Sequence, residues 1–151
     1  MESVEQYKMA EHTAHETLAI VEKALEKTKS LKKAVIMELP PRADSARLQS
    51  LTEFCNNVLK NAAMASAYKD KIIIGSLDPL YSHSNADIFG HPSSPNYDGI
   101  HMRGKSGKWA YTGCIMAAVK AAGLTYESSR SSSPPTATLI STSNSFQALS
   151  N

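Results

Sequence analysis

Apolar residues recur at helical spacing in three stretches of the chain. Polar and charged residues fill the positions between them, so each stretch predicts a helix with one face on a core and the other in water. The first stripe is Ala14, Leu18, Val21 and Leu25. The second is Leu48, Leu51, Cys55, Val58, Leu59 and Ala62. The third, in a helix from about Ser106, is Tyr111, Ile115, Ala118 and Ala122.

Residues that favour helix ends lie next to these stripes. The first helix is expected to end near residues 29–30. Asp44 is predicted to cap the second helix, because its carboxylate can accept a free amide of the first turn. Gly123 followed by Leu124 is typical of a glycine cap at the end of the third helix.

Two short apolar runs lie on either side of the second helix. Residues 34–39 (AVIMEL) end at a Pro-Pro pair, and residues 71–77 (KIIIGSL) end at Asp-Pro. Both are too short for helices, and their nearly continuous apolar character is typical of strands covered on both faces. Strand, helix and strand in this order predict a right-handed βαβ unit with parallel strands. The expected fold class is α/β, with a long polar loop over residues 78–105.

The chain divides into one expected domain, residues 1–125, and a Ser/Thr-rich tail, residues 126–151. The tail composition predicts disorder, although residues 137–141 (ATLIS) could pair as a weak strand. Two parallel strands with flanking helices leave sheet edges unpaired, which is unusual for a sheet of this kind. We therefore expect N-terminal strands to be missing from the sequence. A second copy, a partner protein or a longer gene product could supply them.

Composition narrows the classes of protein and partner. The 151 residues are 42% hydrophobic, which is enough for one packed core. A net charge of +2, from 16 Lys+Arg and 14 Asp+Glu, gives no strong nucleic-acid signal. There is no apolar run of the roughly 18 residues that a membrane helix needs, and no signal-peptide core at the start. We expect a cytoplasmic protein with no membrane partner, whose Cys55 and Cys114 are buried thiols rather than a disulfide.

The densest group of reactive side chains is the string YDGIHMRGK, residues 97–105. Loops at the carboxyl ends of parallel strands are where α/β proteins usually build their sites. Asp98 and His101 are three residues apart, so the carboxylate can orient one imidazole nitrogen and leave the other as a general base. Gly99 would let the turn bend. The alternative is that Asp98 only caps the turn and His101 is a solvated loop histidine.

The string YDGIHMRGKSGKWAYTGCI resembles the last conserved block of the SGNH (GDSL-like) hydrolase superfamily. The upstream string KKAVIMELPPRAD is similar to the preceding strand and turn of SGNH-like domains in invertebrate proteins, some of them encoded by retroelements. The resemblance covers roughly residues 4–124 and implies the C-terminal portion of such a domain. It implies a partial flavodoxin-like three-layer sandwich acting mostly on esters, with Asp98 orienting the imidazole and His101 as general base.

Three residues that the family uses have no counterpart in the sequence. They are the nucleophilic serine of a Gly-Asp-Ser block and the glycine and asparagine that stabilise the oxyanion. Loss of a single oxyanion donor costs about 3–4 kcal/mol, so the chain alone is expected to be inactive. Ser76 follows the second apolar run but lacks the flanking pattern of a nucleophile. The alternative function is a non-catalytic interaction module completed by a partner or a second copy.

Further residues near the predicted site are candidates for contact with a substrate. The possible substrate-edge residues, for an ester substrate, are Arg42, Tyr97, Arg103 and Lys105. For Arg42, an ion pair with Asp44 is the alternative. No cofactor and no metal site are expected, because the histidines of the first helix have no further ligand at suitable spacing. Trp109 and Tyr111 are expected to be packing residues.

Residues 99–106 match the phosphate-loop pattern G-x-x-x-x-G-K-[ST]. No buried strand precedes the match, and no later strand carries an aspartate for magnesium. The match is therefore interpreted as accidental. Because basic side chains gather near a predicted helix N-terminus, anion binding by this loop is a third possibility.

Overall fold

The computed structural model describes residues 3–124 of the chain. Its elements are α1 (Val4–Lys27), β1 (Ala34–Met37), α2 (Ala46–Ala65), β2 (Ile72–Gly75), α3 (Asn85–Phe89) and α4 (Lys105–Ala121). Short 3-10 helices precede and follow β2, namely η1 (Lys69–Lys71) and η2 (Asp78–Ser82). The two strands are parallel, with Ala34 beside Ile72 and Met37 beside Gly75. The α/β class and the βαβ order are therefore confirmed. The expected tail and the strand at residues 137–141 lie outside the described residues.

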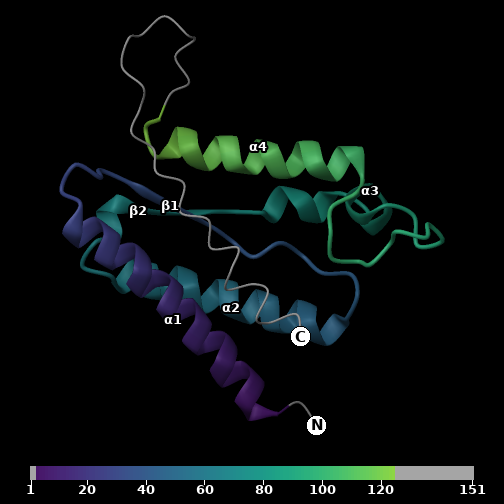
Figure 1. The fold of residues 1–151 in the computed structure, drawn as a ribbon, viewed down its shortest axis with the longest axis horizontal. Coiled ribbons are helices and arrows are strands. Elements are labelled where there is room, and N and C mark those ends of the chain that lie inside the picture. Colours follow the sequence, from purple (N-terminus) through teal and green to yellow (C-terminus); the bar gives the residue numbers. More distant parts are fainter. Residues whose placement is uncertain (1–2, 125–151) are drawn as a thin grey trace, which may run out of the picture.

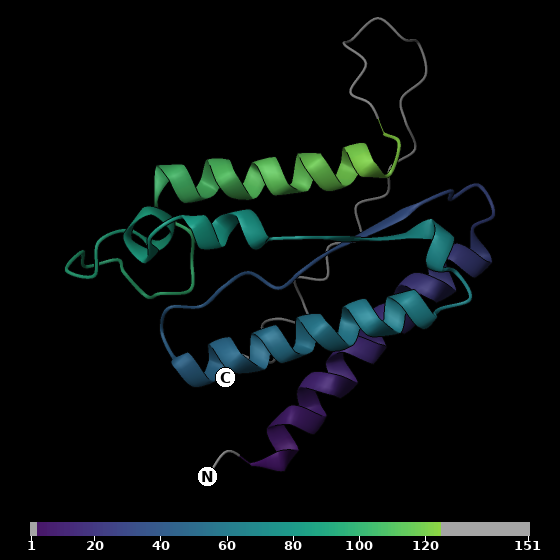
Figure 2. The ribbon, with the colours of Figure 1, turned by 180° about the vertical axis from the view of Figure 1, so that it is seen from behind.

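Helices cover both faces of the two-stranded sheet. Figures 1 and 2 show α4 on one side of β1 and β2, and α1 with α2 on the other side. The helix α2 is the crossover that joins the two parallel strands. Among residues 3–124, no helix has both the length and the apolar character needed to cross a membrane.

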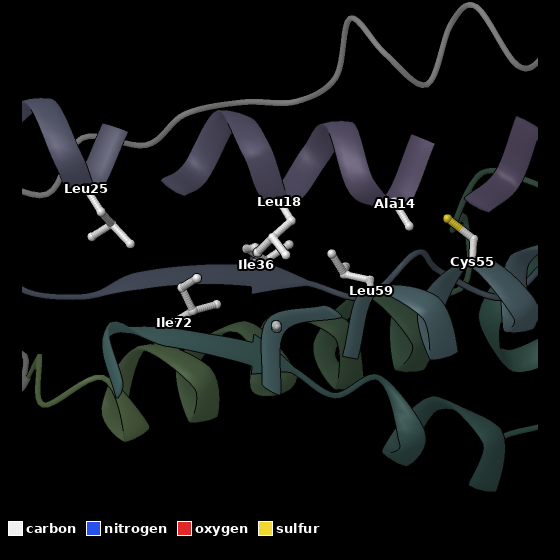
Figure 3. Packing of buried hydrophobic residues seen from close by; sticks show 8 residues of the cluster. Ala14, Leu18, Leu25, Ile36, Cys55, Leu59 and Ile72 are labelled. Carbon is white, nitrogen blue, oxygen red and sulfur yellow. The ribbon is translucent and has the colours of Figure 1, made fainter. Parts of the chain in front are cut away.

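The larger core lies between α1, α2 and the sheet, where the predicted stripes meet. Figure 3 shows side chains of α1 and α2 pointing toward one another and toward the strands. The buried members are Ala14, Leu18, Leu25, Ile36, Cys55, Leu59, Ala63 and Ile72. The helix α1 begins at Val4, earlier than its apolar stripe, because Tyr7 packs edge-to-face on Phe54 with ring centroids 5.0 Å apart. Both cysteines are free and buried, as expected.

A second core lies between α4 and the segment after β2. Its buried members are Leu77, Leu80, Ile88, Phe89 and Cys114. The prediction of an unbroken loop over residues 78–105 is wrong, because this segment contains η2 and α3. Ser84 and Asp87 form a capping box that starts α3, each side chain bonding the other's main-chain amide. The longest continuously exposed stretch within it is residues 91–96.

Of the two predicted helix caps, the one at the start of α2 is wrong and the one at the end of α4 is confirmed. The cap of α2 is Ser45, whose side chain accepts a hydrogen bond from Leu48 N, so the prediction of Asp44 is wrong. Asp44 instead binds the guanidinium of Arg42. At the end of α4, Gly123 has φ +80°, and Leu124 N donates to Val119 O, which confirms the glycine cap.

One edge of β1 faces away from β2. Glu38 N donates to Gly75 O at 3.0 Å, so the even-numbered residues of β1 direct their main-chain groups to β2. Val35 and Met37 direct theirs to the opposite side. Within residues 3–124 no hydrogen-bond partner meets these two residues there. The predicted unpaired sheet edge is thus present in the described part of the chain.

Beyond the end of β1, a side chain takes the place of a neighbouring strand. Leu39 is odd-numbered like Val35 and Met37, so its main-chain groups also point away from β2. Its N–H donates to Asn56 Oδ1 at 2.8 Å, and its carbonyl accepts from Asn56 Nδ2 at 3.1 Å. Asn56 is buried in α2 and satisfies both main-chain groups. The free edge therefore stops at residue 39.

Candidate functional site

The loops that carry the predicted site leave the same end of the sheet. Because β1 and β2 are parallel, residues 38–45 and 76–104 both begin at the carboxyl ends of strands. In Figure 1 they lie together at one end of the molecule, away from the loop that precedes β1. This end is the usual position of a site in an open α/β sheet.

Asp98 and His101 are in contact there. His101 Nδ1 lies 2.5 Å from Asp98 Oδ2, while Asp98 Oδ1 accepts hydrogen bonds from Ile100 N and His101 N at 2.9 Å each. The carboxylate thus fixes both the turn and the ring. The His101 side chain is 73% exposed and that of Asp98 33%. Among residues 3–124 nothing is hydrogen-bonded to His101 Nε2, which leaves it open to solvent.

The electrostatics of the pair fix the position of the shared proton. The hydrogen bond from the His101 side chain, followed by those from the His101 and Ile100 amides, holds the pKa of Asp98 well below its usual range. Arg103 adds a cation, its terminal nitrogen 3.6 Å from Asp98 Oδ2. An ionised carboxylate can only accept a hydrogen bond, so the proton of the Asp98–His101 bond lies on Nδ1. When His101 is neutral, its Nε2 therefore carries no proton. Such a ring is oriented to take a proton from a third group.

Gly99 attaches this turn to the loop after β1. Its carbonyl accepts a hydrogen bond from Ala43 N at 2.8 Å. Its φ is +70°, and a Cβ there would lie 2.7 Å from Asp44 N, so both the backbone conformation and the space require glycine. The strings YDGIH and PPRAD, distant in the sequence, therefore form one structural unit.

Arg42 belongs to this unit, but its guanidinium binds Asp44 rather than Asp98 or His101. Its Nε and a terminal nitrogen donate to Asp44 at 2.9 and 2.7 Å, which confirms the ion-pair alternative. This bidentate bond lowers the pKa of Asp44. Arg42 also lines a hollow of about 260 Å³ together with Gln49, Tyr81 and His83. The hollow opens at the same end of the sheet as the Asp98–His101 pair.

The other predicted site residues differ in their relation to the pair. Arg103 faces the Asp98 carboxylate. Tyr97 is half-buried and packs on the second core instead. Lys105 is exposed at the start of α4 and, within residues 3–124, forms neither a hydrogen bond nor an ion pair with Asp98 or His101. Trp109 is 68% exposed, so its expected packing role is wrong, whereas Tyr111 does pack on the second core.

The glycines of the phosphate-loop match have structural roles. Gly104 N donates to Ile88 O at 3.0 Å, and a Cβ on Gly104 would lie 1.7 Å from Asp87 O. Just after the match, a Cβ on Gly107 would lie 2.5 Å from Ile88 Cα. These glycines let α4 begin directly against α3, and Gly99 docks on residues 43–44. The spacing of the match is thus explained by close packing.

Two features of this end were not predicted. Glu38 is buried after β1, where it accepts from Leu77 N at 3.1 Å and pairs with Lys60 Nζ at 3.1 Å. The Glu38 carboxylate accepts from Leu77 N in place of a main-chain carbonyl, at the point where the two strands separate. The hollow beside Arg42 was missed because Tyr81 and His83 lie in the segment interpreted as loop. The sequence did contain a signal for a buried Glu38, because its carboxylate lies within the apolar run at residues 34–39.

The remaining candidates do not join the pair. Ser76 Oγ accepts from Asp78 N at 3.1 Å and is exposed after β2. His12 Nε2 lies 3.2 Å from Glu16 Oε1 on the surface of α1. Across residues 3–124, no three His, Cys, Asp or Glu side chains come together in a way that could hold a metal ion.

Comparison of the chain with protein-family models, with curated proteins and with solved structures gives no match. A function for this chain must therefore be inferred from the Asp98–His101 geometry and from the resemblance of the two strings that meet at Gly99.

Proposed function

We propose that Asp98 and His101 are the acid and base of a Ser-His-Asp site of the SGNH type, acting on esters. The observation that carries the proposal is the 2.5 Å contact between His101 Nδ1 and Asp98 Oδ2, with Nε2 open at the carboxyl end of the sheet. That arrangement matches the role of the acid and base in such a triad.

The nucleophile of this site is supplied by residues outside the sequence. No hydroxyl within residues 3–124 is hydrogen-bonded to His101, and Ser76 is engaged with Asp78. A partial flavodoxin-like three-layer sandwich fits the helices on both faces of the sheet, with further strands pairing on the free edge of β1. The hollow beside Arg42 would then lie within reach of the same sheet end.

The first test uses the chain as it stands. Hydrolysis of short-chain nitrophenyl esters should stay at the background rate, since neither the covalent step nor the oxyanion donors are present. Turnover above background that is lost in His101→Ala would contradict the external nucleophile. The matched control is His91→Ala, which removes an exposed histidine of the segment between β2 and α4 that contacts neither Asp98 nor His101.

The second test adds the nucleophile. If the parent gene encodes a strand followed by Gly-Asp-Ser upstream, the polypeptide that includes it should hydrolyse the same esters. His101→Ala should then reduce kcat by at least a thousandfold, and Asp98→Asn by a similar order, because both act as one unit with the serine. A joined polypeptide whose activity is insensitive to both changes would eliminate the proposal.

The second candidate function is a non-catalytic interaction module. The observation that favours it is the free edge at Val35 and Met37, which offers main-chain groups to an added strand. A gene without an upstream Gly-Asp-Ser block, together with a protein that co-purifies and protects these two amides from exchange, would favour the module over the enzyme.

A further inference from the structure

Lysines gather at the end of the molecule opposite the candidate site. In the sequence they are spread over three separate segments, and acids elsewhere offset their charge. The fold brings the segments together, because the loop before β1, the turn before β2 and the last turn of α4 all lie at the amino ends of the strands (Figures 1 and 2). The members of this lysine cluster are Lys27, Lys29, Lys32, Lys33, Lys69, Lys71 and Lys120.

The strand register sets the spacing within the lysine cluster. Ala34 pairs with Ile72, so Lys33 and Lys71 precede paired residues on adjacent strands, which are about 4.8 Å apart in a sheet. Lys33 Nζ also donates to Asp70 O at 2.5 Å, which holds the two loops together. The cations of both loops therefore form one surface.

The lysine cluster keeps a net positive charge, because only two acids, Glu26 and Asp70, lie in or next to its segments. All seven lysines are exposed, and none forms an ion pair with a residue in 3–124. Lys27 and Lys120 lie in last turns of helices, where a cation offsets the helix dipole. The other five lie in the loop between α1 and β1 or in η1, and among them Lys33 holds the two loops together through Asp70 O. Folding itself does not account for Lys29, Lys32, Lys69 and Lys71.

We infer that the lysine cluster binds the phosphate backbone of a double-stranded nucleic acid. Lysine contacts phosphate as a point charge, and the cluster contains neither arginine nor an exposed aromatic side chain with which to read or stack bases. Surface binding to a membrane needs a continuous apolar face. The exposed large hydrophobic residues beside the cluster, Met64 near the end of α2 and Leu124 just after α4, belong to helices on opposite sides of the sheet and form no such face. The contact is independent of base sequence and of the Asp98–His101 site.

Fluorescence anisotropy of the full chain with labelled random-sequence duplexes, one of DNA and one of RNA, tests this inference. Affinity should fall with added salt, with log K linear in log salt concentration at about 0.9 per phosphate contacted. Lys32→Glu with Lys71→Glu should weaken binding at least tenfold and reduce the salt slope by about 2. The matched control, Lys8→Glu with Lys108→Glu, changes net charge equally on exposed sites remote from the cluster and should retain binding.

Circular dichroism melts establish that each variant folds, and Lys29→Gln with Lys69→Gln replaces the double reversal if the latter unfolds. Loss of binding confined to the cluster variants supports the inference. Equal loss in the cluster and control variants would overturn it, because the attraction would then be one of net charge. Co-sedimentation with phosphatidylserine vesicles but no binding to either duplex would also overturn it and assign the surface to membranes.

Discussion

Among single residues, Gly99 has the largest effect on the candidate site because it joins two loops. Its carbonyl bonds Ala43 N, and its φ of +70° allows the turn that brings Asp98 against His101. The spacing of Asp98 and His101 made their contact possible but left open that Asp98 only caps the turn. The structure shows both the contact and the cap. The docking of the turn on residues 43–44 was not predictable from local pattern, since it depends on the two strands being parallel neighbours.

Gly99→Ala should lower the free energy of unfolding by roughly 1–3 kcal/mol, because it combines backbone strain with a Cβ clash on residue 44. Urea unfolding measures the change. Gly113→Ala is the matched control: a Cβ there meets nothing within 4 Å in the helix α4, so it should stabilise by up to about 1 kcal/mol. A Gly99→Ala protein as stable as the native chain would show that the docking is dispensable.

The Asp98 carboxylate should also make stability depend on acid pH. Its pKa is lower in the folded chain than in the unfolded one, where it is about 3.9. Its stabilising contribution is therefore complete above that value and is lost as the pH falls toward the folded value. The difference in melting temperature between the native chain and Asp98→Asn should shrink as the pH falls below about 4. A difference that persists unchanged at about pH 2 would contradict this.

At the scale of elements, periodicity predicted those that are long enough to show it. The helices α1, α2 and α4 and both strands follow from apolar spacing. The helix α3 has five residues, too few for a stripe, and exists because Ile88 and Phe89 are buried against α4. Its one local signal, the Ser84–Asp87 capping pair, stood in a segment whose composition indicated loop.

Asn56 is the polar residue that closes the end of β1, so Asn56→Ala should destabilise the chain by about 1–3 kcal/mol. The change leaves the half-buried N–H and carbonyl of Leu39 without their partners. Asn57→Ala, the adjacent but exposed asparagine, should change stability by less than about 0.5 kcal/mol. Equal effects of the two substitutions in thermal unfolding would mean that Asn56 contributes only helix propensity.

For the molecule as a whole, the two-stranded sheet has an open side, and hydrogen exchange should detect it. In the isolated chain, the amides of Ile36 and Glu38 should be protected by β2, while those of Val35 and Met37 should exchange faster. Residue-resolved exchange by NMR measures all four. Protection of the odd-numbered amides that disappears on dilution would reveal a second copy on this edge, and protection at every concentration would show that the chain covers the edge itself.

The lysine cluster and the hollow beside Arg42 also belong to this scale. Each gathers residues from separate segments, so net charge and local motifs contained no signal for either one. A parallel βαβ unit sorts its loops to opposite ends of the sheet, and only the complete topology shows which residues share an end.

The exposed stretch at residues 91–96 lies between two firmly held points. Phe89 before it is buried in the second core, and Gly99 after it is bonded to Ala43. A cut in this stretch would divide the chain into two polypeptides that still share an apolar contact between α3 and α4. We expect the two halves, expressed separately, to form a split pair. The second half carries the whole Asp98–His101 turn, and reassembly would dock that turn on Ala43 of the first half.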